Sequence, residues 1–209
     1  AAMAAVVGLD RLFPPPLERA GALSVVVEDR SGRALRAFPV EDGRWRLAAD
    51  LDRIDPEFIA ALLAVEDKRF RHHPGVDPLA VARAGAQAIA RGRIVSGAST
   101  ITMQTARLLE PRPRTLPSKI IETVRALQLE ARLSKDEILE LYLTLAPYGG
   151  NLQGVRAASW AWFGREPDTL TPDQIALLIA LPQSPEARRP DLQPEGARAA
   201  RAAILARLS

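Results

Sequence analysis

The chain has 209 residues, of which 47% are hydrophobic and 25% charged, with a formal net charge of +3. This length and composition suffice for one domain with a sizeable hydrophobic core. Because the chain has no cysteine and only two histidines, disulfides, thiol catalysis, zinc fingers and a histidine-based metal cluster are excluded. The basic residues are almost all arginines, which suits an anionic partner or a phospholipid surface. A GC-rich genome explains the same bias equally well.

The N-terminal end is apolar over residues 1–9, about half the length that a membrane span requires. It is interpreted either as the remnant of an anchor or as an ordinary frayed end. After Pro14–Pro16, the β-branched run at 23–27, the turn signal at 29–32 and the apolar residues at 34–38 predict a β-hairpin. Residues 1–49 are therefore expected to form an N-terminal segment containing this hairpin.

Residues 50–209 are predicted to form a compact helical domain. Helix starts are indicated by Asp55-Pro56-Glu57, by Thr171-Pro172 and by a capping box from Ser134 to Glu137. Loops are predicted at residues 74–75, 92–97, 110–114 and 148–151, where glycine, proline and asparagine gather.

An acidic residue lies on the apolar stripe of the first predicted helix. Ile59, Leu62, Leu63 and Phe70 recur at helical spacing, and Glu66 falls on the same face. Partial burial raises the pKa of a carboxyl group toward neutrality, which suits a general acid or base. The alternative is an ordinary acid at the border of the stripe, paired with Lys68 or Arg69.

The segment Gly97–Gln104 joins a glycine to hydroxyl side chains and then to a helix start. Such a start can bind a phosphate or a sugar oxygen, although simple capping explains Ser99 or Thr100 equally well, and Thr102 and Gln104 could be surface residues. Cations follow at 107, 112, 114 and 119, a spacing that fits either a diphosphate clamp or a solvated face. Glu122 is either an ion-pair partner of Lys119 or a second site acid.

Four segments, in this order, resemble motifs of the glycosyltransferase domain of class A penicillin-binding proteins, glycosyltransferase family fifty-one. Residues 66–75 (EDKRFRHHPG) resemble the first motif, 97–104 (GASTITMQ) the second, 119–122 (KIIE) the end of the third and 135–143 (KDEILELYL) the fourth. Residues 201–205 weakly resemble a fifth. The resemblance covers about residues 50–209 and implies a mostly α, lysozyme-like fold with the small N-terminal hairpin beside it.

The chain departs from these motifs at three positions. Met103 replaces a glutamine of the second motif, Ser118 the arginine of the third and Thr144 the asparagine that ends the fourth. The Met-Gln pair, together with residues 146–155 (APYGGNLQGV), resembles the subgroup designated 1C.

The resemblance implies that Glu66 removes the proton from the 4-hydroxyl of the GlcNAc of lipid II. That oxygen then attacks the anomeric carbon of the growing glycan with inversion, and undecaprenyl diphosphate leaves. Arg107, Arg114 and Lys119 would stabilise the diphosphate, and Glu122 would hold the donor site or a metal, with Mg²⁺ or Mn²⁺ as the divalent cations to consider. Ser99, Thr100 and Gln104 are the expected substrate contacts, whereas Asp67, Phe70, His73 and Gly75 would shape the first motif.

The implied partners are lipid II, the growing glycan strand, moenomycin-type inhibitors and other proteins of cell-wall synthesis. The implied location is the outer, periplasmic face of the cytoplasmic membrane. Residues 76–95 are either a lobe that dips into the membrane surface or an ordinary exposed loop and helix. Nucleic acid is not expected, because the charges nearly balance and no aromatic stacking patch is evident.

Two other functions remain open from the sequence. A lytic enzyme that cleaves peptidoglycan also uses a single glutamate, but it has no diphosphate to stabilise and therefore no need of the cations. A catalytically weak scaffold that binds lipid II or glycan is the second alternative, and the departures at Met103, Ser118 and Thr144 keep it open.

Overall fold

The structure, a computed structural model, describes residues 10–30, 34–91 and 99–208. The apolar start at 1–9 and the loop predicted at 92–97 lie outside the described residues, as does part of the predicted hairpin turn. The chain divides into two compact units. The first unit comprises residues 1–16 and 66–139, and the second unit comprises residues 17–65 and 140–209.

Most of the described chain is helical, as predicted. The helices are α2 (Pro56–Glu66), α3 (Pro78–Arg91), α4 (Ile101–Leu109), α5 (Leu116–Arg132), α6 (Lys135–Leu145), α7 (Val155–Phe163), α8 (Pro172–Ala180) and α9 (Pro194–Leu208). The strands are β1 (Val25–Glu28), β2 (Ala34–Phe38), β3 (Trp45–Arg46) and β4 (Leu152–Gln153). In the part of the chain that the structure describes, no helix is long and apolar enough to cross a membrane.

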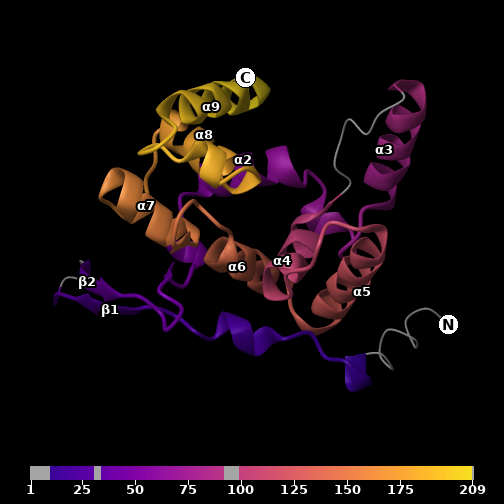
Figure 1. Ribbon diagram of the computed structural model, residues 1–209, viewed down its shortest axis with the longest axis horizontal. Helices are drawn as coiled ribbons and strands as arrows, with labels where there is room; N and C mark the ends of the chain where they lie inside the picture. Colours follow the sequence, from indigo (N-terminus) through magenta and orange to yellow (C-terminus); the bar gives the residue numbers. More distant parts are fainter. Residues whose placement is uncertain (1–9, 31–33, 92–98, 209) are drawn as a thin grey trace. The chain divides into compact units, whose positions relative to one another are not determined.

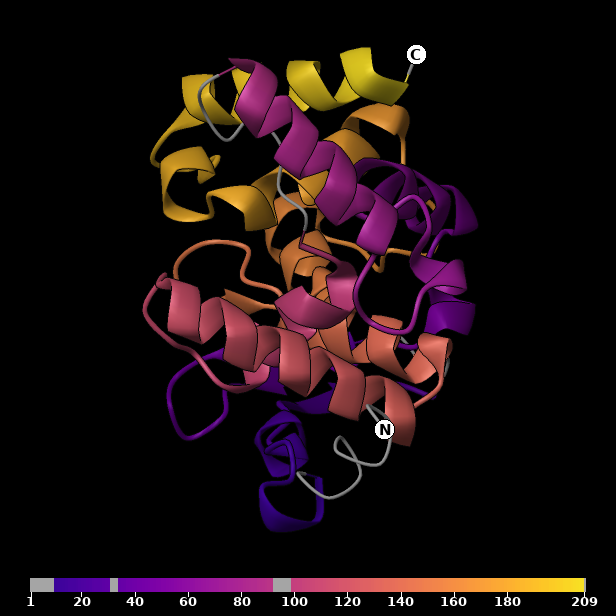
Figure 2. The ribbon, with the colours of Figure 1, turned by 90° about the vertical axis from the view of Figure 1, so that its right-hand side faces the viewer.

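The first unit is built around the packing of α4 against α5, which lie side by side in two views (Figures 1 and 2). Ile101 and Leu109 of α4, with Ala126 and Leu129 of α5, are buried in its core. Thr115 caps α5 by accepting a hydrogen bond from the backbone N–H of Ser118.

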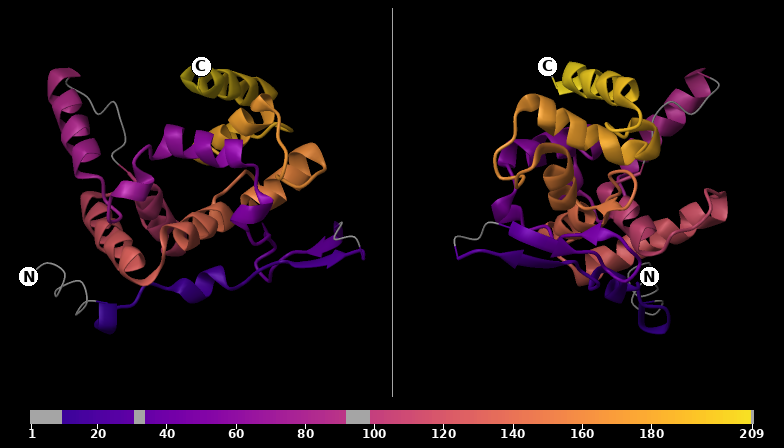
Figure 3. Two further views of the ribbon diagram at one scale, coloured as in Figure 1. Left: turned by 180° about the vertical axis from the view of Figure 1, so that it is seen from behind. Right: turned by 60° about the vertical axis from the view of Figure 1, so that its left-hand side comes forward.

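The second unit packs α8 against α9 and carries the predicted hairpin (Figure 3). Strands β1 and β2 are antiparallel, and Val25 lies opposite Phe38. A second, parallel pair joins β3 to β4, with Trp45 opposite Leu152. The sequence does not predict this pair, because strands of two residues show no alternation of apolar and polar side chains.

The helix starts predicted from local sequence are confirmed. The carboxylate of Asp55 accepts from the backbone N–H of Glu57 at 2.8 Å, and Thr171 forms a complete capping box with Gln174. The carboxylate of Glu137 accepts from the backbone N–H of Ser134 at 2.7 Å. These helix caps can be predicted from sequence because both partners of each hydrogen bond lie within one turn of the helix.

Candidate active site

Glu66 is the last residue of α2, and its side chain is half-buried. The side-chain amide of Gln104, on α4, donates a hydrogen bond to the Oε2 atom of Glu66 at 3.1 Å. Arg69, considered from the sequence as a partner for this acid, instead bonds to Asp77 in both a hydrogen bond and an ion pair. One oxygen of the carboxylate at the end of α2 therefore accepts from a side-chain amide of another helix.

The apolar stripe predicted for the first helix is only partly correct. Helix α2 ends at Glu66, and Phe70 lies in a separate 3₁₀ turn at Phe70–His72. The buried side chains of α2 are Phe58 and Leu62. Phe70 is buried as well, at 1% exposure, but through its own turn and not through the face of α2.

The residues expected to shape the first motif connect it to the second. Asp67 is buried and lies 2.9 Å from the Nε2 atom of His73, and it also accepts from the backbone N–H of Ile101 at 2.9 Å. Gly75 has a φ of +88°, and a Cβ there would lie 2.9 Å from the carbonyl oxygen of Ala126. Only glycine fits this position without strain.

The second motif is held in place by its own hydroxyl groups. Thr100 is the N-cap of α4, accepts from the backbone N–H of Met103 and donates to the carbonyl oxygen of Gly75 at 2.5 Å. Its buried hydroxyl therefore has a structural role, and its contact with substrate stays a prediction. Thr102 is not a surface residue, since it is fully buried and donates to Glu130 at 2.6 Å.

Glu130 connects several of these elements, and no sequence motif indicated it. Its carboxylate also accepts from the Nζ atom of Lys135 at 2.6 Å, and Lys135 donates in turn to the carbonyl oxygen of His73. These contacts tie α5, the start of α6 and the first two motifs together. No local pattern could have indicated this role, since Glu130 lies on an otherwise ordinary helix.

Ser99, Lys119 and Glu122 come together as a second cluster of the first unit. The Nζ atom of Lys119 donates to the hydroxyl of Ser99 and lies 3.5 Å from the Oε2 atom of Glu122. Glu122 is only 7% exposed, so the ion pair with Lys119 compensates for the burial of its charge. The ion pair between Glu122 and Lys119 that the sequence suggested is therefore present. It is compatible with a role for Glu122 as a second acid of the site, because an ion pair of this kind also fixes the position of a catalytic carboxylate.

The remaining cations divide into two groups. Arg112 pairs with Glu110, which also accepts from Arg125 at 2.9 Å. Arg107 is half-buried and Arg114 exposed, and neither has a carboxylate partner among the described residues. They are the arginines of this segment that are available for an anion.

The three departures from the family motifs are accommodated without strain. Met103 is buried in the core, and Ser118 packs at the start of α5 with its hydroxyl 2.9 Å from that of Thr115. Thr144 accepts from the backbone N–H of Ala49 at 2.9 Å. Among the described residues no group of three acidic or histidine side chains could hold a metal ion, and the divalent cation stays a prediction.

The first unit thus contains a carboxylate at a helix end, a cluster of Ser99, Lys119 and Glu122, and two arginines without a carboxylate partner among the described residues. The transglycosylase family matches residues 31–209, and the chain belongs to this family. It is 48% identical to penicillin-binding protein 1C of Escherichia coli over 202 residues, which are 97% of this chain and 26% of that protein.

One further relative and one solved structure are similar to parts of the chain. A putative transglycosylase of Cupriavidus necator is 38% identical over 159 residues, covering 76% of this chain and 68% of that one. The crystal structure of penicillin-binding protein 1A from Haemophilus influenzae aligns at a TM-score of 0.47 and 19% identity, covering 89% of this chain and 19% of that chain. The chain thus spans about a quarter of the length of penicillin-binding protein 1C.

Proposed function

We propose that the chain polymerises lipid II into glycan strands, with Glu66 as the general base. The acceptor is the 4-hydroxyl of the GlcNAc of lipid II, and its proton passes to the carboxylate of Glu66. The oxygen forms a bond to the anomeric carbon of the MurNAc at the reducing end of the growing strand. The bond from that carbon to the diphosphate oxygen breaks, which inverts the configuration.

The departing undecaprenyl diphosphate develops negative charge, which cations must stabilise. Arg107 and Arg114 support this role, because neither is neutralised by a carboxylate among the described residues. Lys119 holds Ser99 and Glu122 in one cluster, so it can bind an oxygen of the diphosphate with its geometry already fixed. Preorganised charge of this kind is usually the largest catalytic contribution.

The observation that carries the proposal is the hydrogen bond from Gln104 to Glu66. It fixes one oxygen of a half-buried carboxylate, so the orientation of the other oxygen is also restricted. A base must lie within hydrogen-bond reach of the proton that it removes, and a restrained carboxylate loses less entropy on reaching that geometry.

We place this activity at the outer face of the cytoplasmic membrane, where a lipid-linked substrate is accessible. Large apolar side chains of the first unit support a membrane surface as partner: Leu79 and Val81 on α3, and Leu116 and Ile120 on α5, are each at least 47% exposed. Exposed apolar side chains next to basic residues are typical of proteins that bind an interface. A moenomycin-type inhibitor and other cell-wall proteins are the further proposed partners.

The test is polymerisation of labelled lipid II in detergent by the wild type and by Glu66→Gln. We expect long glycan from the wild type and a rate at least about 100-fold lower from the variant, since general-base catalysis contributes about 10²–10⁴-fold. Glu137→Gln is the matched control, because glutamine can also complete the capping box at the start of α6. This control should polymerise at the wild-type rate.

The same assay separates the two alternatives. Shortening of preformed glycan without consumption of lipid II would identify a lytic enzyme. If wild type and Glu66→Gln both leave lipid II unpolymerised but bind it or a moenomycin-type inhibitor equally, the scaffold function replaces the proposed one.

A further inference from the structure

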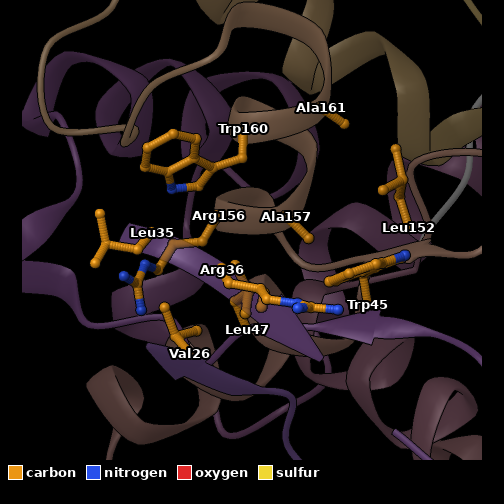
Figure 4. A pocket seen from close by; sticks show the side chains of 11 residues that line it. Val26, Leu35, Arg36, Trp45, Leu47, Leu152, Arg156, Ala157, Trp160 and Ala161 are labelled. Atoms are coloured by element: carbon orange, nitrogen blue, oxygen red, sulfur yellow. The ribbon is translucent and has the colours of Figure 1, made fainter. Parts of the chain in front are cut away.

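The second unit contains an apolar pocket of about 350 Å³ that includes none of the proposed catalytic residues. Its walls come from β1, β2, β3, β4 and α7 (Figure 4). Figure 4 shows the indole rings of Trp45 and Trp160 on two sides of the pocket, while Val26, Leu47 and Ala157 contribute aliphatic surface. Ligand pockets typically measure roughly 300–1,000 Å³, so this one suits one or two apolar side chains.

Strand β2 forms one wall of the pocket through Leu35, Arg36 and Ala37. Val26 lies opposite Ala37 and Val27 opposite Arg36, so Val26, Leu35 and Ala37 share the face of the hairpin on which the pocket lies. The side chain of Arg36 belongs to the other face, with that of Val27. Because β2 is an end strand of its sheet, a strand added beside it would extend both faces.

The outer edge of β2 has no strand partner among the described residues. β1 and β2 form a two-stranded sheet, and the residue before β1 is bonded to β3, since the backbone N–H of Ser24 donates to the carbonyl oxygen of Arg46 at 2.8 Å. The outer edge of β1 is thus partly covered by β3. The outer edge of β2, in contrast, presents backbone donors and acceptors that are not paired with another strand. Such an edge is a template for an additional strand.

The opposite face of the hairpin is apolar as well. Val25 is 64% exposed, Val27 44% and Phe38 42%. A small ligand in the pocket would leave this face in water, whereas an added strand alternates its side chains and contacts both faces. The two apolar faces therefore favour an extended polypeptide over a small molecule or a sugar.

The charges of Arg156 and Arg36 favour an acidic side chain on the face of the hairpin opposite the pocket. Arg156 donates to Glu166 at 2.8 and 2.5 Å, and this contact raises the pKa of the guanidinium, so its charge is already compensated. Arg36 is exposed, and its contact within the described chain is the ring of Phe38, at 4.7 Å from the centroid. Arg36 is thus a cation without a carboxylate partner among the described residues, on the face of β2 opposite the pocket.

We propose that β2 binds an extended segment of another protein as an additional strand, with an apolar side chain in the pocket and an acidic side chain at Arg36. The strand edge supplies the backbone hydrogen bonds, the pocket selects the apolar residue and Arg36 selects the charge. This interaction is independent of the transferase chemistry.

The probe is a panel of fluorescent nine-residue peptides in which Glu alternates with Val, Leu, Phe or Trp. We expect saturable binding to the 209-residue chain, measured by fluorescence anisotropy, for at least one apolar residue. Arg36→Glu should weaken this binding at least tenfold and improve binding of the same peptide with Lys in place of Glu. Ala161→Phe, which fills the rim from α7, should abolish both.

Arg44→Glu is the matched control, because Arg44 is an exposed arginine of the same unit that does not line the pocket. It should leave binding within twofold of wild type, and thermal melting should show that each variant is folded. A peptide N-methylated at alternate residues should not bind, since it cannot complete the ladder.

The proposal is overturned if no member of the panel binds, if Arg36→Glu and Arg44→Glu weaken binding equally, or if N-methylation has no effect. Concentration-dependent dimerisation that is lost in Ala161→Phe would also overturn it, because the occupant would then be a second copy of the chain.

Discussion

At the residue scale, Gln104 restrains the carboxylate of the proposed base, Glu66. Family resemblance implies a substrate contact for Gln104, but its amide donates to Glu66 at 3.1 Å. We expect Gln104→Leu to lower kcat about 10–100-fold with little change in KM for lipid II, because misplacing a catalytic group by about 1 Å can cost 10²-fold. Steady-state kinetics with labelled lipid II measures both constants. A raised KM at unchanged kcat would instead make Gln104 a substrate ligand.

Asp77 is the residue from which a pH dependence of stability follows. Its hydrogen bond from Arg69 lowers the pKa of the carboxyl to about 2. A lowered folded-state pKa stabilises the fold above the unfolded-state value of about 3.9, and this stabilisation disappears as the pH falls from about 4 through 2. Asp77→Asn should therefore melt a few degrees lower than wild type at pH 6, and the two melting curves should converge near pH 2. A constant difference across this range would contradict the assignment.

The proposed site residues could be named from the sequence, whereas their contacts could not. Glu66, Ser99 and Lys119 follow from motif order, and the i,i+3 spacing indicates the pair of Lys119 with Glu122. The bonds of Gln104 to Glu66 and of Thr102 to Glu130 join residues that are 38 and 28 positions apart. Such contacts depend on how the helices pack, and a single sequence does not contain this information.

At the element scale, α7 begins after one glycine and ends at another, both with positive φ. Gly154 has a φ of +87°, and a Cβ there would lie 2.8 Å from the carbonyl oxygen of Thr144. Gly164 has a φ of +69° and open space around it. Alanine at 164 should cost about 1–2 kcal/mol for the left-handed backbone alone, while alanine at 154 adds a steric clash. Chemical denaturation should thus show a larger loss of unfolding free energy for Gly154→Ala, and equal losses would contradict this account.

The sequence predicts an element well when the residues that determine it lie close together in the chain. The capping box at Ser134 and the hairpin were confirmed, because their partners are close in sequence. The end of α2 was placed too late, since the apolar spacing continues to Phe70 while the backbone turns at Glu66. The pairing of β3 with β4 joins residues 107 positions apart and left no periodic pattern.

At the scale of the whole molecule, the net charge of +3 is small, whereas several large apolar side chains are exposed. We therefore expect binding to phospholipid vesicles that depends more on apolar insertion than on salt. Leu79 on α3 is 63% exposed and Leu116 on α5 is 82% exposed. Burying one such side chain contributes about 1.5–3 kcal/mol, so Leu79→Ser or Leu116→Ser should reduce the vesicle partition coefficient by about tenfold or more.

The comparison that decides this prediction is Leu192→Ser in the second unit, where the leucine is 62% exposed. It removes the same apolar surface at a place to which we assign no membrane contact, so its partition coefficient should stay at the wild-type value. Co-sedimentation with vesicles of neutral and of anionic lipid, each at low and high salt, separates the two forces, because salt screens the charges and leaves apolar insertion intact. Equal losses for all three variants would mean that exposed leucines bind lipid wherever they lie, and the assignment of the membrane surface to α3 and α5 would be wrong.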